Sequence, residues 1–293
     1  MLNHIENRTI ILTHRGLDLQ KTDKYFIESS AEAFKDQLNR GYGIEFDIRI
    51  TKDNKFIIFH DEDLSRLTNN KDSRKIKDLT LEELLNVDLN GSHIISLSQL
   101  LDLIENIPAS NTVSALHLKS KMQNVKYLDL LVKELKSRDL SKFIIFDVFK
   151  KTAIYLKANL PNIRLAPSVA HPYDIERYNS AVGGTLWSLS EVLNNSELFY
   201  AVWLDEWDTL DKNLQKKIFY NQETFNSCRS AGLKIFLVTP ELHSTSPGLY
   251  GGEAHEDAND EKTLMKRIKE IIKLKPDGLC TDYPDQVKDL LSL

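Results

Sequence analysis

The chain has 293 residues, with 38 basic and 43 acidic side chains and a net charge of −5. Hydrophobic residues make up 41% and charged residues 28%, as in ordinary globular proteins. This composition excludes a disordered chain, a collagen-like rod and a strongly basic nucleic-acid-binding protein. No cationic start precedes a short apolar run, and no apolar stretch reaches about 18 residues, so we expect a cytoplasmic protein without a membrane segment.

The two cysteines, Cys228 and Cys280, are too far apart in the sequence to form a closely spaced metal-binding or redox motif. We expect both to be reduced and to pack in the core as small hydrophobic side chains. No basic patch with interleaved aromatic residues indicates nucleic acid, and the apolar helical surfaces require no protein partner. A small molecule is the expected partner, and nothing in the sequence specifies an oligomeric state.

Apolar, β-branched runs recur along the chain with helical patterns between them. The runs cover residues 9–13, 42–50, 55–59, 114–119, 143–148, 163–169, 201–205, 234–239 and 278–281. The run 55–59 follows its predecessor through a turn-rich tetrapeptide, so we predict that it is the second arm of a hairpin. The remaining runs form a series of eight strands.

Several of the intervening helices have recognisable ends. Ser29 with Glu32 predicts a capping box for a helix that ends at Gly41, and Thr80 with Glu83 predicts another. Apolar residues at helical spacing also occupy 125–135 and 264–272. Eight strands that alternate with helices, without repeats or linkers, predict one domain over residues 1–293, an α/β protein with a (β/α)8 TIM barrel fold. The active site of such a barrel lies at the carboxyl ends of the strands.

Two acidic residues alternate with large apolar residues in the strand 42–50. The alternation sends Glu45 and Asp47 to one face and their apolar neighbours to the other. If the apolar face packs against helices, both acids lie inside the barrel, where burying charge is costly unless a cation compensates it. A metal ion is the simplest such cation. The alternative is an exposed strand on which both acids pair with lysines.

The strand 114–119 has the same alternation, which places His117 and Lys119 on one face. A metal ligand and a cation would then point into the barrel together. A single histidine in a strand is more often a hydrogen-bonded core residue than a ligand. The interpretation of His117 as a ligand therefore depends on the other candidate residues.

Two further histidines end apolar strands, His14 after 9–13 and His60 after 55–59. We expect both at the rim of the barrel. A pair of imidazoles beside a metal suits acid–base chemistry at neutral pH, where one takes a proton from a nucleophile and the other gives one to a leaving group. Arg15 adds a planar set of donors that matches phosphate oxygens.

Short motifs follow one another in a set order along the chain. They are His14-Arg15-Gly16; Glu28-Ser29-Ser30 with Ala33-Phe34; Glu45-x-Asp47 with Thr51-Lys52-Asp53; His60-Asp61 with Leu64 and Arg66; Leu79-Thr80-Leu81-Glu82-Glu83-Leu84; and Asp277-Gly278-Leu279-Cys280-Thr281-Asp282-Tyr283-Pro284. With this ordered set the chain resembles the glycerophosphodiester phosphodiesterase family. No single motif carries the resemblance alone.

The resemblance implies a TIM barrel with a small insertion at about residues 61–97. It also implies a divalent cation, usually Ca²⁺ or Mg²⁺, held by carboxylates at Glu45 and Asp47. His14 and His60 would act as acid and base. The substrate phosphodiester would bridge the metal and the cations Arg15 and Lys119.

The chain departs from the family pattern at one expected ligand. Where the family has Glu-x-Lys, this chain has His117-x-Lys119, so the resemblance places His117 at a metal ligand. An imidazole is less negative and softer than a carboxylate, which favours Mn²⁺ or Zn²⁺ over Ca²⁺.

The segments that would contact the alcohol part of a substrate are less clearly marked. The family's Trp-Thr-Val-Asn motif is missing, and the strand 234–239 leads through Glu241 and His243 into a polar loop. We predict that residues 240–260 form a lid with Glu241 and His243 near the substrate, the alternative being simple solvation. Asp205 shares a strand face with Trp203 and could accept a hydrogen bond from a hydroxylated substrate.

These residues favour a metal-dependent hydrolase that splits a glycerophosphodiester, or a related polyol or sugar phosphodiester, into a phosphomonoester and an alcohol. One alternative is a lipid phosphodiesterase that forms a cyclic phosphate and requires an apolar patch near the site. Another is a non-catalytic barrel that binds a phosphorylated ligand. The retention of both rim histidines and both acids argues against the second alternative.

Overall fold

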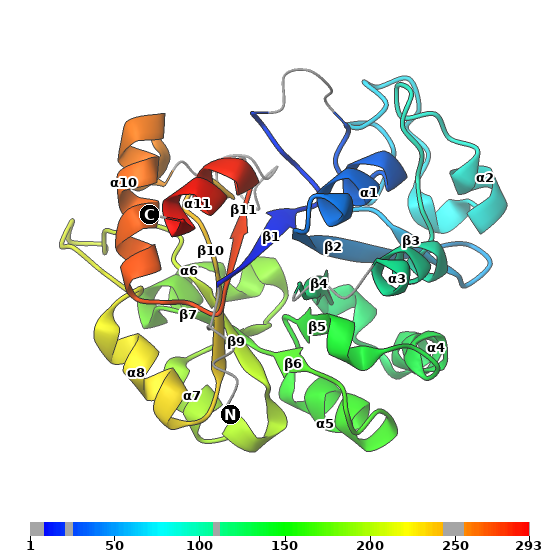
Figure 1. Ribbon diagram of the computed structural model, residues 1–293. Helices are drawn as coiled ribbons and strands as arrows, with labels where there is room; N and C mark the ends of the chain where they lie inside the picture. Colours follow the sequence, from blue (N-terminus) through cyan, green and yellow to red (C-terminus); the bar gives the residue numbers. More distant parts are fainter. Residues whose placement is uncertain (1–8, 21–25, 108–111, 243–254, 293) are drawn as a thin grey trace, which may run out of the picture.

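The computed structural model describes residues 9–20, 26–107, 112–242 and 255–292. Parallel strands form the centre of the molecule, and helices surround them (Figure 1). The strands are β1 (Ile10–His14), β2 (Gly43–Ile50), β3 (Phe56–Ile58), β4 (Ser114–His117), β5 (Phe143–Phe146), β6 (Leu165–Ala166), β7 (Ser168–Ala170), β8 (Leu186–Trp187), β9 (Ala201–Asp205), β10 (Lys234–Val238) and β11 (Gly278–Thr281).

The strand order is β6-β5-β4-β2-β1-β11-β10-β9-β7-β8, with β3 antiparallel to β2 as the predicted hairpin arm. In this order β6 is at one end and β7 is next to the other end, and Pro167 alone separates these two strands in the chain. The backbone N–H of Asp147 donates to Ala166 on one side, and the N–H of Trp203 donates to Pro167 on the other, at 3.1 and 3.0 Å. The ring of strands therefore returns on itself, and the TIM-barrel fold expected from the sequence is confirmed.

Two details of the strand prediction are corrected. The run 163–169 is not one strand but two short ones, β6 and β7, because Pro167 has no N–H to continue a regular ladder. The strand β8, which pairs with β7, was not predicted, since two residues carry no detectable alternation.

The helices of the structure cover the outside of the strands (Figure 1). They are α1 (Ala31–Asn39), α2 (Leu81–Leu85), α3 (Leu97–Asn106), α4 (Val125–Leu135), α5 (Lys150–Asn159), α6 (Pro172–Val182), α7 (Leu189–Leu193), α8 (Gln222–Ser230), α10 (Glu261–Lys273) and α11 (Pro284–Leu291). The capping box of Thr80 and Glu83 at α2 is confirmed. That predicted for Ser29 is wrong, because Ser30 caps α1 and Ser29 has a φ of 58°.

Strand alternation divides the apolar side chains into an outer and an inner set. Ile44, Phe46 and Ile48 of β2 belong to the large core shared with the helices. The inner set is separate and combines aromatic rings with small side chains, as the narrow lumen of a barrel requires: Leu12, Val113, Ala115, Ile144, Phe146, Ala166, Ala201, Trp203, Phe236, Val238, Leu242 and Cys280. On β2 and at the carboxyl end of β4, the inner faces carry polar residues instead, among them Glu45, Asp47 and His117.

The segment between β3 and α3 contains α2 and a short 3-10 helix, Ile76–Asp78. Its apolar side chains form a cluster of their own that includes Leu64, Ile76 and Leu84. This segment coincides with the insertion expected at about 61–97. Residues 243–254, most of the predicted lid, lie outside the described residues. In the described part of the chain, no helix has both the length and the apolar character needed to span a membrane.

Candidate active site

A cavity of about 420 Å³ lies at the carboxyl ends of the strands, within the size range of small-molecule sites. His14, His117 and Asp205 are the last residues of β1, β4 and β9, and all three line it. Its other lining residues are Arg15, Glu45, Arg49, His60, Glu62, Lys119, Ser120, Lys121, Phe146, Asp147, Ser168, Ala181, Val182, Leu186, Trp203, Trp207, Val238, Leu242 and Cys280.

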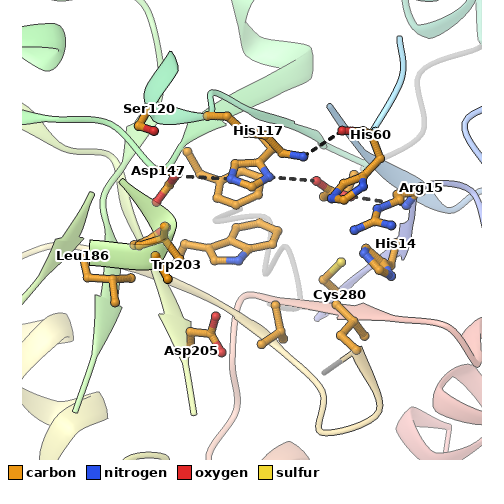
Figure 2. A pocket seen from close by; sticks show the side chains of 18 of the residues that line it. His14, Arg15, His60, His117, Ser120, Asp147, Leu186, Trp203, Asp205 and Cys280 are labelled. Carbon is orange, nitrogen blue, oxygen red and sulfur yellow. Dashed lines mark hydrogen bonds and ion pairs between the residues drawn. The ribbon is translucent and has the colours of Figure 1, made fainter. Parts of the chain in front are cut away.

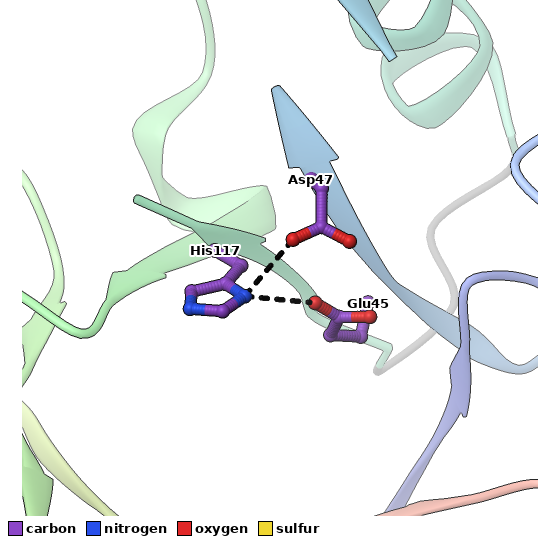
Figure 3. Close-up of side chains that lie close together, drawn as sticks. All are labelled: Glu45, Asp47 and His117. Carbon is purple, nitrogen blue, oxygen red and sulfur yellow. Dashed lines mark ion pairs between the residues drawn. The ribbon is translucent and has the colours of Figure 1, made fainter. Parts of the chain in front are cut away.

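Glu45, Asp47 and His117 meet on the inner faces of β2 and β4, which are paired in register (Figure 3). Nδ1 of His117 lies 3.0 Å from Oδ1 of Asp47 and 3.9 Å from Oε1 of Glu45. One donor atom of each residue lies within 4.8 Å of the others. These three residues form the candidate metal centre that the sequence predicts.

The chemistry of this group fits a divalent cation. Glu45 and Asp47 are buried, and among the described residues neither oxygen of Asp47 receives a hydrogen bond of regular geometry. Two buried carboxylates supply the oxygen donors that Mg²⁺, Ca²⁺ and Mn²⁺ prefer, and the imidazole adds a donor suited to Mn²⁺ and Zn²⁺. A cation bound by the three residues would compensate the two buried charges.

Charge within the group is unevenly distributed. Burial and the neighbouring charge of Asp47 raise the pKa of Glu45 above its ordinary value. Burial alone would also raise the pKa of Asp47, but the positive charge of Lys119 and the nearby imidazoles outweighs it and holds that pKa well below the ordinary value. Asp47 is therefore the carboxylate that stays ionised most readily.

His117 has a carboxylate at each ring nitrogen. Its Nε2 lies 3.3 Å from Oδ2 of Asp147, the residue that follows β5, and its ring stacks on Phe146 with centroids 4.6 Å apart. Burial alone would lower the pKa of His117, but its interactions with the carboxylates of Asp147 and Asp47 raise it to about 9. Without a metal, the protonated ring forms ion pairs with both carboxylates, so a metal at Nδ1 must displace a proton.

Two cations border the carboxylates. Nζ of Lys119 lies 3.2 Å from Oδ1 of Asp47 and donates to the carbonyl oxygen of His60 at 3.1 Å. Nε of Arg15 lies 3.5 Å from Oδ2 of Asp47. Burial lowers the pKa of Lys119 to about 8. Burial would also lower the pKa of Arg15, but the charges of Asp47, Glu28 and Glu45 raise it.

The turn after β1 directs Arg15 toward the site. Arg15 and Gly16 both have left-handed backbone angles, with φ of 54° and 75°. A Cβ at Gly16 would lie 3.1 Å from the side chain of Ala33, so a glycine suits both the conformation and the close contact with α1. The backbone N–H of Arg15 donates to the carbonyl oxygen of Glu45 at 3.0 Å, which ties the turn to β2.

Each rim histidine has an aspartate at Nδ1. Nδ1 of His14 lies 3.1 Å from Oδ1 of the buried Asp282, and Nδ1 of His60 lies 2.7 Å from Oδ1 of Asp61. A carboxylate at Nδ1 fixes the tautomer and leaves Nε2 available for proton transfer. Burial lowers the pKa of His60 to about 4, so this imidazole is neutral at neutral pH.

An ionic chain joins His60 to Arg15 through the insertion. Nε of Arg66 lies 2.7 Å from Oδ2 of Asp61, and its Nη2 lies 2.6 Å from Oε1 of Glu28. The same Oε1 accepts a hydrogen bond from Nη1 of Arg15 at 3.2 Å. The insertion thereby fixes the positions of both His60 and Arg15.

Apolar and aromatic side chains line much of the remaining cavity. Phe146 and Trp203 stack with centroids 4.0 Å apart, and Leu186 and Trp207 also line the cavity. In Figure 2, Leu186, Trp203 and Asp205 lie across the cavity from His14, Arg15 and His60. The cavity therefore has a charged side and a largely apolar side that includes one carboxylate.

The structure gathers most of the predicted site residues but not all of them. The cavity is lined by His14, Arg15, Glu45, His60, His117, Lys119 and Asp205. Asp47 is not a lining residue, but it contacts His117 and Lys119. Glu241 is buried and accepts hydrogen bonds from the hydroxyls of Thr239 and Thr281, both at 2.6 Å, and is not among the lining residues. His243 lies outside the described residues.

The sequence analysis did not identify two carboxylates of the site. Asp147 and Asp282 each follow directly after the end of an apolar strand, β5 and β11. A polar residue at this position of a barrel points to the site, and this signal could have identified both. Their partners, His117 and His14, come from neighbouring strands.

Comparisons with known proteins give the chain's relatives in sequence and in fold. Residues 14–286 match the model of the glycerophosphoryl diester phosphodiesterase family. Over 82 residues the chain is 37% identical to the glycerophosphodiester phosphodiesterase of Caldanaerobacter subterraneus subsp. tengcongensis. The aligned residues make up 28% of this chain and 31% of that relative. The chain spans about a third of the length of the curated relatives it matches.

Solved structures share the fold over nearly the whole chain. The glycerophosphodiester phosphodiesterase of Thermotoga maritima superimposes with a TM-score of 0.60 at 22% identity, covering 96% of this chain and 98% of that one. A phosphodiesterase of Oleispira antarctica, solved with the product sn-glycerol-3-phosphate, gives 0.63 at 16% identity and covers 98% of both chains. The match of the family model over almost all of the sequence shows that this chain belongs to the glycerophosphoryl diester phosphodiesterase family.

Proposed function

We propose that this protein hydrolyses a glycerophosphodiester, or a related polyol or sugar phosphodiester, to a phosphomonoester and an alcohol with the help of a divalent cation. The observation that carries the proposal is one cavity with two aspartate-paired histidines beside the group of Glu45, Asp47 and His117. Membership of the family supports the reaction class. The bound product of the Oleispira antarctica phosphodiesterase supports a phosphomonoester as product here.

The charged side of the cavity would bind the phosphodiester. Arg15 and Lys119 provide positive charge that is already fixed by ion pairs with Asp47. Such preorganised charge stabilises the additional negative charge of a phosphoryl-transfer transition state. A divalent cation held by Glu45, Asp47 and His117 would supply further positive charge to the phosphate oxygens.

His14 and His60 would transfer the protons. One imidazole takes the proton of the attacking hydroxyl as its oxygen bonds to phosphorus, and the other protonates the alcohol oxygen as the bond from phosphorus to that oxygen breaks. Asp282 and Asp61 hold the two rings in position. The attacking hydroxyl comes from water or from a neighbouring carbon of the substrate, in which case a cyclic phosphate forms first.

The apolar side of the cavity would hold the alcohol portion. Aromatic rings such as Trp203 stack on the C–H faces of sugars and polyols, and the carboxylate of Asp205 accepts hydrogen bonds from their hydroxyls. The same lining favours a second candidate, a lipid phosphodiester whose alkyl part packs on Leu186 and Trp207.

Phosphorus NMR on a panel of substrates tests the proposal. Glycerophosphocholine, glycerophosphoethanolamine, a sugar phosphodiester and a lysophospholipid are incubated with the wild type, His14→Ala and His60→Ala. We expect a phosphomonoester from the first three substrates and its loss in both variants, with circular dichroism confirming that they fold. A cyclic phosphate formed only from the lysophospholipid would favour the lipid alternative. Absence of turnover of every substrate by the wild type, or full activity of both variants, would contradict hydrolysis by this site.

A further inference from the structure

Asp147 lines the cavity, but its carboxylate has no role in the proposed reaction. It is buried, and its Oδ2 lies 3.3 Å from Nε2 of His117 (Figure 2). The opposite ring nitrogen of His117 faces Asp47 and Glu45. We infer that Asp147 is a positioning residue, which accepts the Nε2–H of His117 and thereby turns the Nδ1 lone pair toward Glu45 and Asp47. The inference rests on the metal site of the proposed function.

A neutral imidazole exists in two forms. Such a ring carries one N–H, and a metal binds only the nitrogen that lacks it. A carboxylate only accepts hydrogen bonds, so Asp147 selects the form of His117 with its hydrogen on Nε2. A histidine ligand commonly donates its second N–H to a carboxylate, which fixes the orientation of the ring.

Asp147 can hold this position because its backbone is fixed on both sides. Its N–H donates to the carbonyl oxygen of Ala166 at 3.1 Å, and its carbonyl oxygen accepts from Nε2 of the buried Gln123 at 2.7 Å. Its φ of 67° lies in the left-handed region, which aspartate tolerates better than most residues. These bonds keep an uncommon conformation that aims the side chain at His117.

The plane of the His117 ring is restrained as well. Phe146, the residue before Asp147, stacks on it with an interplanar angle of 16°. The stack fixes the plane, and the carboxylate fixes the rotation within the plane. A glutamate at position 117 would not need Asp147 to orient it, because both of its carboxylate oxygens can bind a cation.

Calorimetric titration with Mn²⁺ tests the inference without any substrate. Wild type and Asp147→Ala are compared in the native background and in a His117→Glu background. We expect Asp147→Ala to weaken Mn²⁺ binding by about 10- to 100-fold when His117 is present. In the His117→Glu background the same change should alter the affinity by less than about twofold, since no imidazole remains to be oriented.

Two matched variants distinguish the positioning of His117 by Asp147 from a general effect of its negative charge. Asp147→Asn keeps an acceptor for Nε2–H and should recover part of the lost affinity. Asp205→Ala removes an equal charge from the same cavity and should weaken Mn²⁺ binding less than Asp147→Ala does. An equal loss in Asp205→Ala, an equal loss in both backgrounds, or unchanged affinity in Asp147→Ala would overturn the inference.

A direct readout of the tautomer completes the test. In nitrogen-15 spectra of the Zn²⁺-loaded wild type, we expect the hydrogen of His117 on Nε2, and a mixture of forms in Asp147→Ala. A hydrogen on Nδ1 in the wild type would contradict the inference. Because neither measurement uses turnover, a protein that binds Mn²⁺ as expected but hydrolyses nothing would contradict only the proposed function.

Discussion

Nδ1 of His14 lies 3.1 Å from Oδ1 of Asp282, although the two residues are 268 positions apart in the chain. The pairing of β1 with β11 brings them together, since Thr13 and Thr281 are in register. The first and last strands of the barrel thus build one acid–base unit. His60 and Asp61, by contrast, are neighbours in the sequence.

Replacement of Asp282 by asparagine should impair the chemical step. Without the carboxylate, the His14 imidazole loses the partner that fixes its tautomer and the orientation of its ring. We expect kcat to fall by about 10- to 100-fold, less than the roughly 100- to 10,000-fold loss expected for His14→Ala. Steady-state kinetics with the exposed Asp289→Asn as control provide the measurement. A change in KM alone would argue against this role.

Glu28→Ala should destabilise the fold. Glu28 is buried and accepts from both Arg15 and Arg66, so its removal leaves the buried Arg15 with less compensation. Breaking a buried ion pair costs about 3–5 kcal/mol, and we expect the free energy of unfolding in urea to fall by about 3 kcal/mol. Glu32→Ala, which removes a pair with the exposed His93, should cost less than about 1 kcal/mol. Equal losses in the two variants would contradict the prediction.

The metal-free protein should lose stability as the pH falls from about 6.5 to about 4, in part because of His60. Burial lowers its pKa to about 4 in the folded state, so over this range the unfolded chain binds a proton that the folded chain does not. The difference amounts to about 3 kcal/mol at pH 4. Urea unfolding of His60→Asn should show a correspondingly shallower dependence on pH. Identical slopes for variant and wild type would refute this assignment.

Both thiols should be unreactive in the native protein. Cys228 and Cys280 are free and buried, as the sequence predicts. Burial raises the pKa of Cys228 to about 11 and that of Cys280 well above its ordinary value, so little thiolate is present at neutral pH. A disulfide reagent should therefore react with two thiols after denaturation and with neither beforehand. Rapid reaction of either thiol in the native state would contradict the prediction.

Strand alternation predicts the part of the site that lies within strands. Its period of two places Glu45 with Asp47 and His117 with Lys119, and the β2–β4 pairing then joins the two pairs. Strand alternation does not predict the orientation of residues that lie just beyond the strands. The orientation of Asp147 depends on a left-handed backbone, and the pairing of His14 with Asp282 depends on closure of the barrel.

The segments with weak local patterns were predicted least well. The strand β8 has two residues, and Pro167 interrupts the run that was expected to be continuous. The first capping box failed because Glu32 contacts a residue that is distant in the sequence. The carboxylate of Glu32 accepts a hydrogen bond from the backbone N–H of His93 at 2.9 Å, and not from the backbone N–H at the N-terminus of α1 as a capping box requires. Such tertiary contacts are absent from the sequence pattern.

In the proposed reaction, the group of Glu45, Asp47 and His117 holds a cation required for phosphodiester hydrolysis. The most direct test follows phosphomonoester release from glycerophosphocholine by metal-stripped protein, to which Mg²⁺, Ca²⁺, Mn²⁺ or Zn²⁺ is returned in turn. Glu45→Gln and Asp47→Asn are assayed alongside. We predict no turnover without metal, recovery at about one equivalent of at least one cation, and no recovery in either variant. Full turnover by the stripped protein, or by both variants, would contradict the account.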